Sequence, residues 1–121
     1  MKSICLMRDI YKALSDFENN FEKVHGVGLN EAMALCSIGG DTLSSTEISE
    51  KTGMSTSHTS KVIRSIEEKE LIVRALGQKD KRQMYFNLSE KGKTCLSAMK
   101  CGSVEIPELL KPIFEKYCQG E

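Results

Sequence analysis

The middle of the sequence changes its apolar period from that of helices to that of strands. The spacing predicts helices over 45–52 and 55–70, and Gly53 between them favours the left-handed backbone conformation that ends a helix. From Leu71 onward, apolar and polar residues alternate on both sides of the polar segment 77–82, which predicts a β-hairpin. Two helices around a tight glycine turn, followed by a hairpin, indicate a winged helix-turn-helix.

Two further helices are expected before this core. Apolar residues three and four positions apart predict a long amphipathic helix over 3–24 and a buried helix over 30–38, which a glycine pair ends. A turn or short strand follows at 41–44, and either Ser44 or Ser45 is placed to cap the next helix.

The C-terminal region also predicts helices. Ser89 opens one that Gly102 ends, and another follows Pro107 as far as Tyr117. Pro112 has no amide hydrogen and is expected to kink or divide this last helix. The expected fold class is therefore mainly α (α+β), a winged helix-turn-helix with terminal helices.

The length of 121 residues and the apolar content of 40% suit one domain with a real core. We expect a single winged helix domain over 1–121, with a DNA-binding lobe over 29–88 and dimerisation helices over 1–28 and 89–121.

Charge is balanced overall, with 17 basic and 17 acidic residues, but it is unevenly distributed. Residues 1–50 carry a net charge of −4, residues 51–93 carry +5 and residues 94–121 carry −1. A basic middle lets one face meet phosphates while the rest stays solvated. The alternative is an ordinary solvated surface of mixed charge.

The start of the helix over 55–70 is rich in hydroxyl groups, which longer basic side chains follow. Such groups bind phosphate or base edges, and a helix N-terminus favours an anion. The alternative is that the hydroxyl groups only cap the helix. The candidate DNA contacts are Ser55, Thr56, Ser57, His58, Ser60, Lys61 and Arg64.

The sequence resembles the MarR family of bacterial regulators. The resemblance is carried by 43–55 (LSSTEISEKTGMS), 69–72 (KELI), 80–83 (DKRQ) and 88–92 (LSEKG), and it covers nearly the whole chain. It implies that Arg82 enters the minor groove and that Asp80 orients its guanidinium. An ordinary surface ion pair is the alternative. Further expected DNA contacts are Ser45, Thr46, Lys79, Lys81 and Gln83.

The resemblance also implies a homodimer on a palindromic operator. Independently of the family, two apolar stripes supply interface surface, although each is also explained as intrachain core. The helix after Ser89 is cut short at Cys101-Gly102, which departs from the family pattern. The expected interface residues are Ile4, Met7, Tyr11, Leu14, Leu109, Ile113, Phe114 and Tyr117.

The five cysteines form no C-x-x-C pair, so we expect reduced, mostly buried thiols and neither a disulfide framework nor a metal site. Neither histidine has a metal-ligand partner, and no cofactor is expected. Relatives respond to small amphipathic ligands or use a reactive cysteine. Cys5, in the first helical turn near Arg8, is a candidate sensor, although an inert thiol is the favoured interpretation.

The sequence has no run of 18 apolar residues and no signal-peptide pattern, which predicts a cytoplasmic protein without a membrane partner. No catalytic constellation is recognisable. The predicted function is that of a sequence-specific double-stranded DNA-binding regulator, a repressor released by a small ligand. The alternative is a winged-helix module that binds protein.

Overall fold

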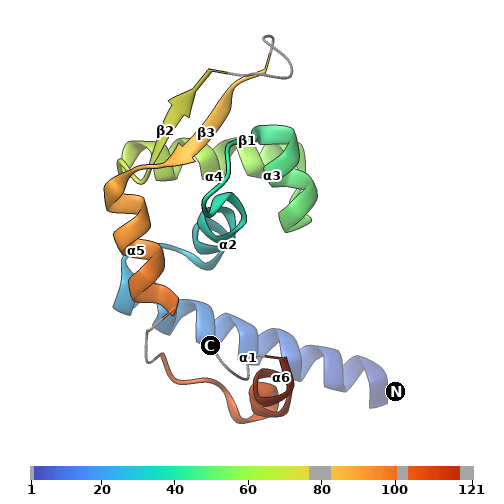
Figure 1. The fold of residues 1–121 in the computed structure, drawn as a ribbon. Coiled ribbons are helices and arrows are strands. Elements are labelled where there is room, and N and C mark those ends of the chain that lie inside the picture. Colours follow the sequence, from blue (N-terminus) through green and yellow to red (C-terminus); the bar gives the residue numbers. More distant parts are fainter. Residues whose placement is uncertain (1, 77–82, 101–103, 118–121) are drawn as a thin grey trace. The chain divides into compact units, whose positions relative to one another are not determined.

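The computed structural model describes residues 2–76, 83–100 and 104–117 (Figure 1). The chain forms two compact units. Residues 29–99 make up the central unit, and the terminal unit combines residues 1–28 with residues 100–121. Residues 89–99, which we expect among the terminal helices from the sequence, group with the central unit.

The terminal unit contains α1 (Lys2–His25), the 3₁₀ helix η1 (Glu108–Leu110) and α6 (Lys111–Tyr117). The ring of Phe17 lies 6.2 Å from that of Phe114, centroid to centroid, so α1 packs on the C-terminal segment. The predicted last helix is divided at Lys111, just before Pro112. Proline suits the first turn of α6 because amide hydrogens there have no partner within the helix.

The central unit has the fold predicted from the sequence, a winged helix-turn-helix. Its three-stranded antiparallel sheet has the order β1-β3-β2, with Leu43 opposite Phe86 and Ile72 opposite Leu88. The largest fully buried apolar side chains come from three of its helices: Leu35, Ile38, Ile48 and Ile66. Its elements are α2 (Leu29–Ile38), β1 (Leu43–Ser44), α3 (Ser45–Thr52), α4 (Thr56–Glu68), β2 (Ile72–Ala75), β3 (Tyr85–Leu88) and α5 (Glu90–Lys100).

Local side-chain chemistry fixes both ends of α3. The Glu47 N–H donates to Ser44 Oγ at 3.2 Å, and the Ser44 N–H donates to the Glu47 carboxylate at 3.0 Å. This reciprocal capping box selects Ser44 from the two candidate caps. Gly53 ends the helix with a φ of 79°, as predicted.

The connection after α4 determines where that helix ends. Glu70 adopts a φ of 63°, a left-handed conformation, and α4 stops at Glu68 instead of the predicted residue 70. The Ser89 hydroxyl donates to the Glu70 carbonyl at 2.6 Å and accepts from the Gly92 N–H at 3.0 Å. Ser89 therefore joins the end of the α4 connection to the start of α5.

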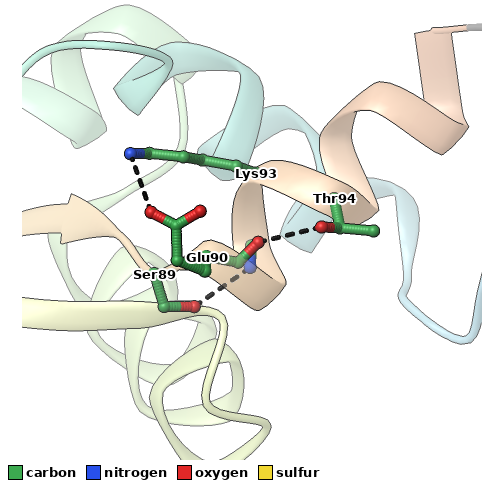
Figure 2. A network of polar contacts seen from close by, with 5 residues as sticks. Ser89, Glu90, Lys93 and Thr94 are labelled. Carbon is green, nitrogen blue, oxygen red and sulfur yellow. Dashed lines mark hydrogen bonds and ion pairs between the residues drawn. The ribbon is translucent and has the colours of Figure 1, made fainter.

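Figure 2 shows the polar contacts that surround this start of α5. The Thr94 hydroxyl donates to the Glu90 carbonyl at 3.1 Å, and Lys93 Nζ lies 3.4 Å from the Glu90 carboxylate. Gly92 is buried, with its Cα close to the Leu71 carbonyl. Ser89 and Gly92, the serine and the glycine of the segment 88–92, thus both have structural roles.

The prediction of mostly buried thiols is wrong for two of the three cysteines that the structure describes. Cys5 and Cys36 are exposed, because each lies on a helix face that the chain leaves uncovered. Cys95 is partly buried, and burial, together with the Glu31 carboxylate, raises the pKa of its thiol. Cys101 and Cys118 lie outside the described residues.

The described residues contain neither a candidate metal site nor a membrane-spanning helix. No group of three or more histidine, cysteine or acidic side chains is arranged there to hold a metal ion. No helix in that part of the chain has both the length and the apolar character needed to cross a membrane.

Candidate nucleic-acid interface

Hydroxyl groups hold the turn between α3 and α4 in a defined geometry. The Ser49 hydroxyl donates to the Met54 carbonyl at 2.7 Å, and the Met54 N–H donates to Thr52 Oγ1 at 3.3 Å. Ser55 caps α4 by accepting from the His58 N–H at 3.1 Å. The buried Thr59 hydroxyl returns a hydrogen bond to the Ser55 carbonyl at 2.8 Å. The start of α4 is therefore fixed relative to α3.

One face of α4 is available to a partner. The helix buries Thr59, Val62, Ile63 and Ile66, and the helical period of 3.6 residues puts Ser57, Lys61 and Arg64 on the opposite side. The side chains of these three residues are exposed, and none of them forms a hydrogen bond or ion pair with another described residue. We call this set the outward face of α4. Glu68 is exposed at its C-terminal end.

The other predicted contacts in the described part of the chain are also exposed. Ser45 and Thr46 lie in the first turn of α3, and Gln83 lies two residues before β3. Thr56 and Ser60 lie beside the outward face, where the Ser60 hydroxyl donates to the Thr56 carbonyl at 3.0 Å. Lys79, Asp80, Lys81 and Arg82 lie outside the described residues, so their predicted roles stay predictions.

Two residues of the basic middle form ion pairs that the sequence did not reveal. Arg74 on β2 donates twice to the Glu67 carboxylate, at 2.7 and 3.3 Å. This hydrogen bonding lowers the pKa of Glu67 and raises the pKa of Arg74. Lys69 Nζ lies 2.8 Å from the Glu31 carboxylate, which also accepts from the Ser65 hydroxyl at 2.7 Å. Lys69 and Arg74 are therefore occupied by intrachain contacts.

A contact at the other end of α4 involves a residue that sequence reasoning missed. Asn30 Nδ2, in the first turn of α2, lies 3.2 Å from His58 Nε2. Asn30 and His58 are 28 positions apart in the sequence, so no local sequence pattern links them. His58 therefore lies on the edge of α4 next to α2, beside the outward face.

The predicted dimer interface residues lie in the terminal unit, and most are exposed. The side chains of Ile4, Met7 and Tyr11 on α1 have exposed fractions of 58, 63 and 76%. Phe114 is only partly exposed, because it packs near Phe17. The remaining residues of the prediction, Leu14, Leu109, Ile113 and Tyr117, are exposed as well. Dimerisation through these surfaces stays a prediction.

The fold and the polar outward face of α4 define a winged helix-turn-helix protein. A model of the MarR family matches residues 25–83. This segment contains the helix-turn-helix, and over it the chain is similar to the MarR family. No curated protein sequence matches the chain.

Solved structures of other proteins have the same fold, among them the transcriptional regulator BldR. YusO from Bacillus subtilis is 23% identical, with a TM-score of 0.64, and the match covers 95% of this chain and 77% of that one. BldR from Sulfolobus solfataricus is 19% identical, with a TM-score of 0.71 and coverages of 99% and 85%. A DNA complex of MepR from S. aureus is 19% identical, with a TM-score of 0.61 and coverages of 94% and 86%.

Proposed function

We propose that this protein binds double-stranded DNA in a sequence-specific manner and represses transcription. The observation that carries the proposal is the outward face of α4, where the exposed side chains of Ser57, Lys61 and Arg64 have no hydrogen-bond or ion-pair partner among the described residues. In the proposed complex α4 occupies the major groove, and the hairpin over 73–87 reaches the minor groove. MepR, a structural neighbour, was solved bound to DNA.

The proposal includes a homodimer on a palindromic site, because a two-fold protein presents two equivalent recognition helices. Exposed apolar side chains on α1 and α6 support this assembly, since a monomer would leave them in water. The regulator would act in the cytoplasm, where the DNA of a bacterial-type cell is located.

Release by a small amphipathic ligand completes the proposal. Among the structural neighbours, a MepR-like protein was solved with pseudoligands, with a TM-score of 0.75 and 18% identity. The ligand would act by binding the DNA-competent and DNA-incompetent states with different affinities.

Selection from a random pool of DNA duplexes tests the proposal, with sedimentation of the same purified protein. We expect an enriched palindrome bound by two chains, because two copies of α4 would read related half-sites. A monomer that enriches no sequence even at low salt would contradict the proposal. That result would favour the winged-helix module that binds protein.

The hairpin over 73–87, which is the wing of this fold, is tested separately by the variant Arg82→Ala. We expect weaker binding to all duplexes and a smaller slope of log affinity against log salt concentration, by roughly one unit per chain. Arg64→Ala is the comparison, because a residue in the major groove should change base preference as well as affinity. Equal affinities of Arg82→Ala and the wild type at several salt concentrations would contradict the wing assignment.

A further inference from the structure

The contact between Asn30 and His58 has a chemical consequence for the edge of α4. An amide nitrogen carries two hydrogens and does not accept a hydrogen bond, so Asn30 Nδ2 is the donor across the 3.2 Å contact. His58 Nε2 is then the acceptor and carries no proton. In a neutral imidazole the proton therefore resides on Nδ1.

The direction of this proton follows from the shape of the ring. The two ring nitrogens of an imidazole point in nearly opposite directions, so Nδ1–H points away from Asn30 when Nε2 faces it. His58 is exposed, and it lies in the first turns of α4. The backbone N–H of His58 is also bound by Ser55 Oγ, which limits movement of this turn.

We propose that Asn30 is a positioning residue that sets the tautomer of His58 and so gives α4 a hydrogen-bond donor of fixed direction for a DNA phosphate. This inference rests on the proposed function. A phosphate is the expected acceptor because His58 lies beside the outward face, and phosphates line the walls of the groove that the outward face would enter. The N-terminal end of a helix also favours an anion.

The tautomer is measured without DNA, by long-range ¹H–¹⁵N correlation on the imidazole rings at about pH 8, where unperturbed histidines are neutral. The chain has only two histidines, so His58→Ala assigns the spectrum. We expect Nδ1–H in the wild type and a shift in Asn30→Ala to Nε2–H, the form that a solvated histidine side chain prefers in water. Asn20→Ala, on an exposed position of α1, is the matched control and should leave the tautomer unchanged.

DNA affinity gives the second readout. We expect Asn30→Ala and His58→Ala each to weaken binding roughly fivefold, and the double variant to lose no more than His58→Ala alone. A mere packing role for Asn30 would leave the tautomer of His58 unchanged. Nε2–H in the wild type, or Nδ1–H retained in Asn30→Ala, would overturn the positioning role.

Wild-type affinity of His58→Ala would overturn the phosphate contact. If the wild type bound no duplex, the proposed function would fail, and the phosphate contact with it. The tautomer shift in Asn30→Ala would still decide the role of Asn30, because it is read from the protein alone.

Discussion

Replacing Gly92 with alanine is expected to lower the free energy of unfolding by about 3 kcal/mol. A Cβ at this position would lie 2.0 Å from the Leu71 carbonyl oxygen, a backbone atom that cannot rotate away. The same carbonyl accepts from the Ser89 N–H at 3.0 Å, so moving it would disturb a second contact. Alanine gains about 1 kcal/mol over glycine in helix propensity, which is smaller than the cost of the overlap. Urea unfolding measures the difference.

Gly40→Ala is the matched control for this experiment. A Cβ at Gly40 meets no atom within 4 Å, so the free energy of unfolding should change by less than about 0.5 kcal/mol. If Gly92→Ala were as stable as Gly40→Ala, the close packing of α5 on the Leu71 backbone would be disproved.

Reversing both charges on the outward face of α4 is expected to have the largest effect on DNA binding. In Lys61→Glu/Arg64→Glu, two cations that would face phosphates or bases become anions, and affinity should fall by at least about 100-fold at physiological salt. Both side chains are exposed, and the structure shows no described partner for either. The fold should therefore be retained in circular dichroism. A fluorescence anisotropy titration with the selected duplex measures the affinity.

The control pair is Lys12→Glu/Lys23→Glu on exposed positions of α1. It changes the net charge by the same amount, and we expect a much smaller loss of affinity. If both double variants lost affinity equally, binding would follow the total charge of the protein. The assignment of α4 as the recognition helix would then fail.

Most of the fold could be predicted from the sequence because its signals act over a few residues. The helices around Gly53, the cap at Ser55 and the alternating pattern after Leu71 each depend on near neighbours in the chain. The predicted end of the helix over 55–70 was wrong because a contact with a more distant residue determines it. The helix α4 ends at Glu68 because Glu70 takes a left-handed conformation in a turn that Ser89 holds.

The candidate site was predicted only as a set of polar residues in sequence. Local periodicity separates Lys61 and Arg64 from the buried positions of α4, since these depend on the helical repeat. Periodicity does not reveal that Lys69 and Arg74, in the same basic region, form ion pairs with Glu31 and Glu67 respectively. Those pairs depend on how α4 packs against α2 and β2.

The order of the elements and the polar character of α4 therefore follow from the amino-acid sequence alone, because helical and strand periodicity are encoded locally. Three features depend on tertiary packing: which of the described cations remain available, which nitrogen of His58 faces Asn30, and the lack of room for a side chain at Gly92. Each of these contacts joins different parts of the fold, so the distance between the two residues is set by the packing of whole elements.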